Sequence, residues 1–335
     1  MSLMKYSISI IVPIYNAGPY IERCTQSLFE QDMADLEYIF VNDCTPDNSV
    51  ELLKQLINDE FPDLKERIVI VDLDTNAGVA NARNIGLDNA HGEYIGFCDS
   101  DDWIEKNMYS SLYKKAKETG AEIVGCNMVN EYQDASTVFV QNYGEDKQIN
   151  ISHLLLGSIF PSLCTEIVKR SLYVNNNIRF ISGINMGEDL LVNTQLYVNA
   201  NDISFVAEPF YHYRHDIDSS CEKRNLSSVM SDIKVASLIE EYLVKKDMAI
   251  CLMKEMNFRK FFSKLPLWTS KEYRDVKTWR NTFPDSNRYI FEYEQLDWKM
   301  KVEYWLVYIG LIPLASIFVK LLNFQHHIKT FFDAK

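Results

Sequence analysis

Short apolar runs alternate with stretches of helical spacing through the first hundred residues. Four runs are rich in β-branched and aromatic residues, and between them apolar positions recur every three to four residues. The predicted strands are residues 7–14, 38–41, 68–71 and 94–98, and the predicted helices are residues 20–31, 49–59 and 79–89. This alternation predicts an α/β fold, in which a mostly parallel sheet has helices on both faces and right-handed crossovers.

Polar side chains follow each of these predicted strands. Tyr15 and Asn16 come after the first strand, Asp43 after the second, Asn76 after the third, and Asp99 opens an acidic run after the fourth. The carboxyl ends of parallel strands meet at one edge of a sheet, and open α/β sheets bind their ligands outside that edge. We therefore expect these four loops to form one site.

The middle of the chain has less regular patterns. Residues 130–150 are polar and typical of a hairpin or a loop, and residues 165–171 fit a strand or a helix equally well. The other predicted elements are helices at 107–117, 151–158 and 190–199, a loop at 182–189, and strands at 122–128, 203–206 and 209–214.

Long helical patterns replace the alternation after His215. Residues 254–280 carry eight Lys or Arg against three Asp or Glu, a local excess of +5. Residues 304–319 are sixteen uncharged and mostly apolar residues, whereas a bilayer-spanning helix needs about 20. Two interpretations stay open: a helical appendage that packs on the rest of the protein, or a membrane-surface element with aromatic side chains at the interface.

Composition narrows the class of protein. The chain has 335 residues, 47% of them hydrophobic, which is enough for one large or two smaller domains. A net charge of −13 argues against a nucleic-acid binder, because affinity for phosphate backbones comes mostly from Lys and Arg. Seven scattered cysteines without a Cys-x-x-Cys pair, and no signal-peptide pattern, favour a reduced, cytoplasmic setting.

The acidic run gives the first candidate chemistry. Asp99, Asp101 and Asp102 follow the fourth strand within the sequence Gly-Phe-Cys-Asp-Ser-Asp-Asp-Trp. Three neighbouring carboxylates repel one another, so the run either is open to water or holds a cation. Oxygen ligands suit Mg²⁺ or Mn²⁺, which leave positions for phosphate oxygens. A solvated acidic turn is the alternative, and an Asp-x-Asp pattern alone does not decide between them.

Four motifs in order nevertheless make the chain resemble a known family. They are Ser-Ile-Ile-Val-Pro-Ile-Tyr-Asn, Val-Asn-Asp-Cys-Thr-Pro-Asp-Asn-Ser, Asn-Ala-Gly-Val-Ala-Asn-Ala-Arg-Asn-Ile-Gly and the acidic run. Together they resemble family 2 glycosyltransferases of the GT-A fold, and Glu188-Asp189, followed by Tyr211-His212-Tyr213-Arg214, extends the resemblance to about residue 215. The resemblance implies a catalytic domain at 1–215, with nucleotide-sugar binding in 1–102 and the acceptor side in 103–215, followed by a helical region at 216–335.

The resemblance also implies a reaction. Enzymes of this family move a sugar from a nucleotide diphosphate to an acceptor hydroxyl, usually with inversion. We therefore expect a UDP-sugar as donor, a divalent metal (Mn²⁺ or Mg²⁺) as cofactor, and a glycan or lipid-linked acceptor in surface polysaccharide or glycolipid synthesis. The setting would be the cytoplasm or the inner face of the cell membrane, with peripheral membrane contact through the C-terminal region left open.

Roles on the donor side follow from the motif positions. Asp101 matches the family's metal-binding acid, while Asp99 matches the acid that faces the ribose and donor sugar. Asp99 and His212 are further candidate metal ligands. The remaining donor-side candidates are Pro13, Tyr15 and Asp43 for the nucleobase, with Asn76, Arg83 and Ser100; Arg83 is expected to contact either the nucleotide or an acid of the run.

On the acceptor side, Asp189 matches the family's general base. Glu188 and Trp103 are the other acceptor-side candidates. Acids before a helix also stabilise its N-terminus, so capping is the alternative role for Glu188 and Asp189.

Three other functions are alternatives to a glycosyltransferase. A dehydrogenase is excluded because no Gly-x-Gly-x-x-Gly follows a predicted strand. A nucleotidyltransferase stays open, as does a sugar-nucleotide-binding or membrane-associated scaffold protein without catalysis.

Overall fold

The computed structural model describes residues 6–215 and 225–318. It divides into two compact units, residues 1–224 and residues 225–335, and each is described by itself. The boundary predicted after residue 215 borders residues 216–224, which lie outside the described part of the chain, as does residue 319 of the apolar stretch.

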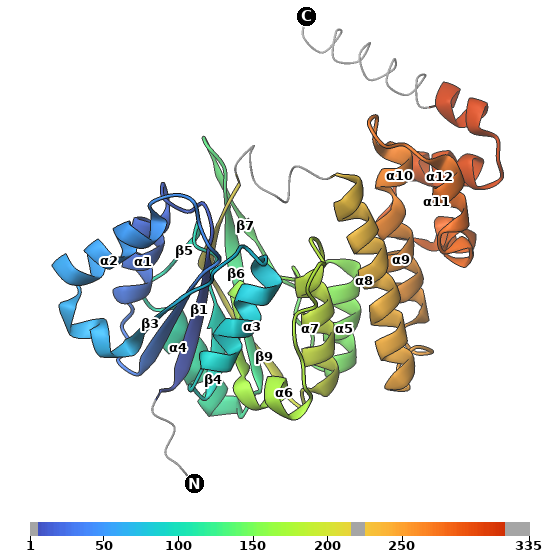
Figure 1. The fold of residues 1–335 in the computed structure, drawn as a ribbon. Coiled ribbons are helices and arrows are strands. Elements are labelled where there is room, and N and C mark those ends of the chain that lie inside the picture. The colour runs from blue at the N-terminus through green and yellow to red at the C-terminus, as the bar shows by residue number, and fades with distance from the viewer. Residues whose placement is uncertain (1–5, 216–224, 319–335) are drawn as a thin grey trace, which may run out of the picture. The chain divides into compact units, whose positions relative to one another are not determined.

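A nine-stranded mixed sheet forms the centre of the first unit (Figure 1). The strand order is β3-β2-β1-β4-β8-β6-β9-β5, with β7 paired to β6. The strands are β1 (Ile8–Ile14), β2 (Leu36–Asn42), β3 (Ile68–Asp72), β4 (Tyr94–Phe97), β5 (Trp103–Ile104), β6 (Ile123–Glu131), β7 (Ser136–Phe139), β8 (Glu166–Lys169) and β9 (Ile203–Arg214).

Helices cover both faces of the sheet, as the alternating pattern predicts (Figure 1). They are α1 (Ile21–Phe29), α2 (Ser49–Asp59), α3 (Val79–Asn89), α4 (Met108–Thr119), α5 (Lys147–Leu156), α6 (Arg170–Asn175) and α7 (Glu188–Asn199), with 3₁₀ turns η1 (Pro62–Arg67) and η2 (Leu163–Thr165). Along β4, Tyr94 packs edge-on against Tyr113 of α4, while Phe97 packs against Phe180. Tyr94 and Phe97 are three positions apart, so they point to opposite faces of the sheet, and each is buried on its own face.

Three predictions for the middle of the chain have clear outcomes. The segment 165–171, for which strand and helix stayed open, is a strand followed by a helix, and the strand, β8, runs antiparallel to both β4 and β6. The hairpin expected as one alternative for the polar stretch 130–150 is confirmed, because β7 pairs with β6. The prediction of two strands at 203–206 and 209–214 is wrong, because these residues form one strand. That strand, β9, pairs with β6 through a bulge, where Cys126 lies opposite Val206 and Asn127 lies opposite Pro209. The bulge explains why the apolar pattern of β9 breaks between residues 206 and 209.

The first four strands place their carboxyl ends side by side. β1 is parallel to both β2 and β4, and β2 is parallel to β3, with Ile14 opposite Asn42 and Asn42 opposite Asp72. The loops after these strands therefore share one edge of the sheet.

The second unit is helical. Its elements are α8 (Leu226–Lys245), α9 (Met253–Lys264), α10 (Pro266–Thr269), α11 (Val276–Asn281), the 3₁₀ segment η3 (Pro284–Glu292) and α12 (Trp298–Tyr308), and residues 312–318 are also helical. Phe261 is the centre of an aromatic core, with the rings of Trp279, Tyr293 and Tyr304 around it. Within the described residues, no helix is both long and apolar enough to cross a membrane.

Candidate active site

Arg83 joins three carboxylates at the shared edge of the sheet. Its side chain is buried on α3, and its Nη2 donates to Asp99 Oδ1 at 3.1 Å. Its Nη1 donates to Glu188 Oε1 at 3.2 Å and to Asp189 Oδ1 at 2.5 Å. Asp99 follows β4 and the other two acids open α7, so one guanidinium links the predicted donor side to the predicted acceptor side.

The local backbone explains where the two acids of α7 lie. Gly187 adopts a left-handed φ of 81°, which glycine tolerates, and the helix begins at the next residue. Glu188 and Asp189 therefore lie in the first helical turn, where the helix dipole favours negative charge. The capping role and the ion pairs with Arg83 coexist in this arrangement.

Crowding of carboxylates around one cation sets the charges here. Burial raises the pKa of Asp189 to about 8, opposed by Arg83 and reinforced by the negative charges of Glu188 and Asp99. Although burial lowers the pKa of Arg83, the three acids raise it well above its usual value. The guanidinium stays charged, and Asp189 becomes a stronger base than an ordinary aspartate.

Within the acidic run, the three aspartates have different surroundings. Asp102 is buried, where Tyr211 Oη donates to its Oδ2 at 2.5 Å and the Arg214 backbone N–H donates to its Oδ1 at 2.8 Å. Burial and the charges of Asp101 and Asp99 raise the pKa of Asp102 well above its usual value. Asp102 thus fixes the end of β9 to the acidic run.

Asp101 is the more open acid and the better candidate to hold a cation. Its side chain is 41% exposed, and Arg214 Nη2 donates to its Oδ2 at 3.2 Å. The Arg214 guanidinium also lies over the ring of Tyr20, 3.5 Å from the ring centre. Burial of the carboxyl, followed by the charge of Asp99, raises the pKa of Asp101.

The donor set at Asp99 and Asp101 fits a magnesium-type ion. No group of three or more acidic, His or Cys side chains among the described residues has the arrangement of a complete metal site. Mg²⁺ commonly takes only one or two protein carboxylates and completes its shell with water and substrate phosphates. The partly exposed carboxylates of Asp99 and Asp101 meet that requirement.

The predicted nucleobase residues lie at the same edge with unequal exposure. Tyr15 is exposed, whereas Asp43 is buried and its carboxylate accepts the backbone N–H groups of Ala77 at 2.7 Å and Gly78 at 2.8 Å. The side chain of Asn76 donates to the Asp43 carbonyl at 3.3 Å. Asp43 therefore holds the loop that leads into α3, and Pro13 is half-buried near the end of β1.

Trp103 and His212 form a separate cluster beside the acidic run. The two rings stack with centres 5.1 Å apart, and the Arg23 guanidinium covers Trp103 at 3.2 Å. His212 Nδ1 lies 2.7 Å from Glu131 Oε1, and its Nε2 lies 2.9 Å from Glu105 Oε1. Both ring nitrogens of His212 thus contact carboxylates other than the predicted metal-binding acids. Ser100, between Asp99 and Asp101 in the acidic run, is buried.

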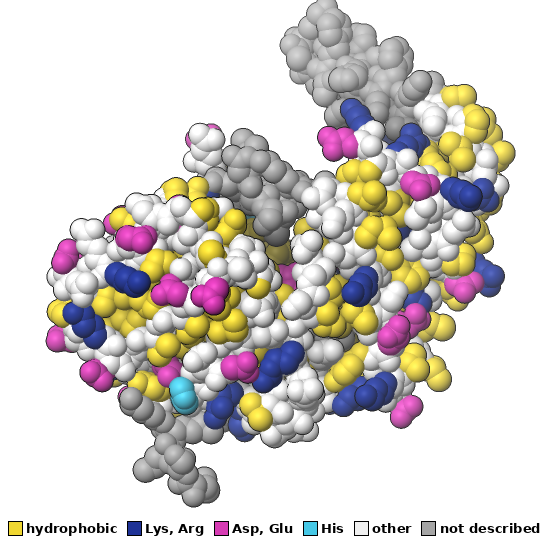
Figure 2. Space-filling view, viewed as in Figure 1, with side chains coloured by type: hydrophobic (Ala, Val, Ile, Leu, Met, Phe, Trp, Pro, Cys, Tyr) yellow, Lys and Arg dark blue, Asp and Glu magenta, His cyan; other side chains and the backbone are white. Residues whose placement is uncertain are grey.

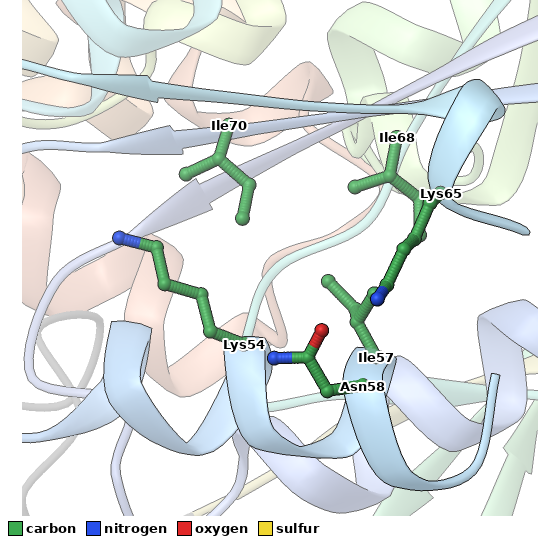
Figure 3. Close-up of a pocket in the computed structure, with 6 residues that line it drawn as sticks. All are labelled: Lys54, Ile57, Asn58, Lys65, Ile68 and Ile70. Carbon is green, nitrogen blue, oxygen red and sulfur yellow. The ribbon is translucent and has the colours of Figure 1, made fainter. Parts of the chain in front are cut away.

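A surface hollow elsewhere on the sheet does not coincide with this site. It is lined by Lys54, Ile57, Asn58, Lys65, Ile68 and Ile70 of α2, η1 and β3 (Figure 3). Ile68 is the first residue of β3, so the hollow extends to the amino end of that strand, whereas the candidate residues follow the carboxyl ends. Its lining of isoleucine, lysine and asparagine side chains holds no carboxylate, histidine or cysteine.

The comparison with protein families agrees with this geometry. Residues 9–169 match the family model described as glycosyl transferase family 2. This part of the chain is similar to glycosyl transferase family 2. The match includes β1 to β4, the acidic run and Arg83, and it confirms the resemblance found in the sequence.

Bacterial glycosyltransferases are among the similar proteins. The uncharacterized glycosyltransferase EpsJ of Bacillus subtilis is 31% identical over 64% of this chain and 63% of its own length. Glycosyltransferase GlyG of Streptococcus pneumoniae is 26% identical over 82% of this chain and 94% of its own length. The aligned part thus spans less than two thirds of EpsJ.

Solved structures support the fold. The crystal structure of Staphylococcus aureus TarS 1-349 in complex with UDP-GlcNAc has a TM-score of 0.70, with 21% identity over 90% of this chain and 87% of that chain. The likeness extends beyond the family 2 domain, and it confirms the GT-A fold with a helical C-terminal region.

The structure brings several of the predicted acids together and shows how Arg83 joins them. Arg83 was expected to contact either the nucleotide or an acid of the run, and the structure shows it on Asp99 and also on two acids more than 100 positions away. The burial of Asp102 under Tyr211 and the pairing of Asp101 with Arg214 were not predicted. A signal for the second of these was present, because Arg214 lies in the last motif of the resemblance.

Proposed function

We propose that this protein is an inverting, metal-assisted glycosyltransferase that moves a sugar from a nucleotide-diphosphate donor, a UDP-sugar, to an acceptor hydroxyl. One observation carries the proposal: a buried arginine holds Asp99, on the donor side, and Asp189, on the acceptor side, in one cluster. Inverting transfer needs a base on the face of the sugar opposite the leaving group, and this cluster sets a base beside a donor-binding acid.

Asp189 acts as the base in this proposal. It accepts the proton of the acceptor hydroxyl while the hydroxyl oxygen attacks the anomeric carbon and the bond to the diphosphate breaks. A carboxylate with a raised pKa accepts that proton more readily than an ordinary aspartate. Arg83 fixes the orientation of Asp189, and Glu188 beside it is available to contact the acceptor.

The donor side holds the leaving group. Asp101, with Asp99, would hold a divalent ion that supplies Lewis-acid stabilisation of the departing diphosphate. Pro13, Tyr15 and Asp43 line the edge at which the nucleobase is expected, and the exposed ring of Tyr15 is available for stacking. The bound nucleotides in TarS support UDP, while a Pyrobaculum calidifontis mannosyltransferase of similar fold is described with GDP-Man and Mn²⁺.

The acceptor is assigned only to a class. TarS is named a poly(ribitol-phosphate) beta-N-acetylglucosaminyltransferase, and a Bacillus spizizenii relative is named a poly(ribitol-phosphate) beta-glucosyltransferase. These names support a role in building a cell-surface polysaccharide or glycolipid. We place that role in the cytoplasm or at the inner face of the cell membrane. Described cysteines that form no disulfide are consistent with that compartment.

A thermal-shift panel tests the donor and metal. UDP-, GDP-, TDP- and CMP-sugars are each added with and without Mn²⁺. We expect stabilisation by a UDP-sugar that increases when Mn²⁺ is present, because the ion joins the diphosphate to the carboxylates. The absence of metal-dependent stabilisation by every donor would refute the proposal.

Asp189→Asn separates catalysis from binding. The variant should lose transfer and keep donor binding, since the base contacts the acceptor. Asp88→Asn, in an exposed pair with Arg179, is the matched control and should keep both. Donor binding with no transfer in the unaltered protein, across a panel of acceptors, would favour the non-catalytic sugar-nucleotide-binding alternative.

A further inference from the structure

The second unit exposes a group of large apolar side chains around α12. Trp298 is 62% exposed and Trp305 is 40% exposed, and Phe291 and Ile309 are also exposed. Ring contacts form two pairs in it: the ring centres of Phe291 and Trp305 lie 6.2 Å apart, and those of Trp298 and Phe318 lie 6.3 Å apart. We call Phe291, Trp298, Trp305, Ile309 and Phe318 the aromatic face.

Helix geometry gives this face a definite direction. Trp298 and Trp305 are seven positions apart on α12, which is two helical turns, so they point to the same side. Tyr304 and Val307 on the other side of the helix are buried, and Tyr304 packs edge-on against Phe261. The helix is therefore anchored by one side in the aromatic core of its unit, while its other side presents tryptophan to solvent.

Leu311, Leu314 and Ile317 extend the apolar surface beyond the aromatic face. Each is more than 40% exposed, and they lie directly after α12. Figure 2 shows hydrophobic side chains gathered on this unit, with Lys and Arg among them. Monomeric proteins in water rarely expose connected apolar surface of this kind without using it for binding.

Charge differs sharply between the two units. Residues 225–335 contain 17 Lys and Arg against 13 Asp and Glu, a net charge of +4, whereas residues 1–224 contain 17 against 34, a net charge of −17. The positive unit is the one that carries the aromatic face, and the exposed Lys299 lies beside Trp298. An anionic surface would attract this unit and repel the other.

We propose that the aromatic face docks in the headgroup region of an anionic lipid bilayer. Tryptophan prefers the boundary between headgroups and acyl chains, and helices with one apolar side lie in that plane. The contact that we propose is peripheral, and none of the helices in residues 225–318 is both long and apolar enough to span a bilayer. This inference concerns a second surface and does not rest on the proposed transfer reaction.

Tryptophan fluorescence of the full chain tests the contact directly. The protein is mixed with vesicles of phosphatidylcholine alone or with 30% phosphatidylglycerol, carrying bromine on the acyl chains as a quencher. We expect binding to the anionic vesicles, at least tenfold stronger than to neutral ones, and quenching of Trp298 and Trp305. Trp279 is buried in the core and should not be quenched.

Variants assign the signal to the aromatic face. Trp298→Gln combined with Trp305→Gln should weaken vesicle binding at least tenfold and abolish the quenching. Ile250→Gln is the matched control, because Ile250 is 90% exposed in the same unit but lies outside the aromatic face, and it should bind as the unaltered protein does. Lys299→Glu should weaken binding to anionic vesicles alone.

Three results would overturn the proposal. The first is no binding of the full chain to anionic vesicles, and the second is equal binding by the double variant when its melting temperature shows that it is folded. The third is a concentration-dependent dimer in sedimentation that the double variant abolishes, because the face would then serve a second copy of the chain. Lys299→Glu keeps the test decisive if the double variant fails to fold.

Discussion

Replacing Arg83 by methionine removes the cation that three acids share. Methionine keeps much of the length and apolar volume of the side chain, so packing on α3 changes little. The carboxylates of Asp99, Glu188 and Asp189 lose ion pairs of 3.1, 3.2 and 2.5 Å. Removing one partner of a buried ion pair leaves the other charge uncompensated, which costs about 3 to 5 kcal/mol.

That cost predicts a large fall in melting temperature at neutral or higher pH. In a unit of this size, 1 kcal/mol corresponds to roughly 2 to 4 °C, so Arg83→Met should lower the melting temperature by about 6 to 20 °C. The sign of its pH dependence is also fixed. Burial already raises the pKa of Asp189 and Arg83 opposes that rise, so without the arginine the folded-state pKa of Asp189 lies still further above its unfolded value. The added penalty therefore grows as pH rises above the unfolded value and is relieved as pH falls.

Thermal unfolding of Arg83→Met at pH 8 and pH 5 measures both effects. Arg179→Met is the matched control, because Arg179 pairs with Asp88 at 3.2 Å in an exposed position, where such a pair contributes about 0 to 1 kcal/mol. The reasoning is refuted if Arg83→Met loses no more stability than Arg179→Met. It is also refuted if the loss is as large at pH 5 as at pH 8.

Two further predictions concern pH. Burial and neighbouring acids raise the pKa of Asp189 to about 8, so kcat/KM for transfer should increase as pH rises towards that value. A kcat/KM that stays constant down to pH 5 would contradict the role of Asp189 as base. Lys264 is fully buried against the carbonyls of Thr282 and Phe283, and burial lowers its pKa to about 7. In the unfolded chain the lysine amine keeps its proton up to about pH 10, so the second unit should gain stability between pH 7 and 10, by up to about 5 kcal/mol. In urea unfolding, Lys264→Met should lack that gain. A variant with the same pH dependence as the unaltered protein would contradict this prediction.

The elements that the sequence predicts best are those that follow a clear turn signal. α2 and α3 begin and end at the predicted residues, 49–59 and 79–89, and the turn-forming residues 45–48 and 76–78 come directly before them. β5 is only two residues long and has no periodicity to detect. β8 and α6 share one short apolar stretch, in which strand and helix patterns cannot be told apart without the neighbouring strands.

The same distinction applies to the site. Its acids can be placed on one edge from the strand pattern, since the chain order of parallel strands fixes where their loops meet. The partners of Arg83 on α7 cannot be placed in this way, because Glu188 and Asp189 lie more than 100 positions after Arg83 in the chain. The burial of Asp102 cannot be predicted from the sequence either, because it depends on Tyr211 of β9, which lies more than 100 positions later in the chain.

The carboxylate of Asp43 gives α3 a mechanical role in joining the two ends of the site. Asp43 holds the backbone N–H of Gly78, the residue that precedes α3, and Arg83 follows five positions later on the same helix. A rise of 1.5 Å per residue makes that distance about 7.5 Å along a single stiff rod. A displacement of the loop where the nucleobase is expected would therefore pass through about one and a half turns of α3 to the guanidinium of Arg83, which orients Asp189. Donor binding would in this way be transmitted to Asp189 by the backbone of α3.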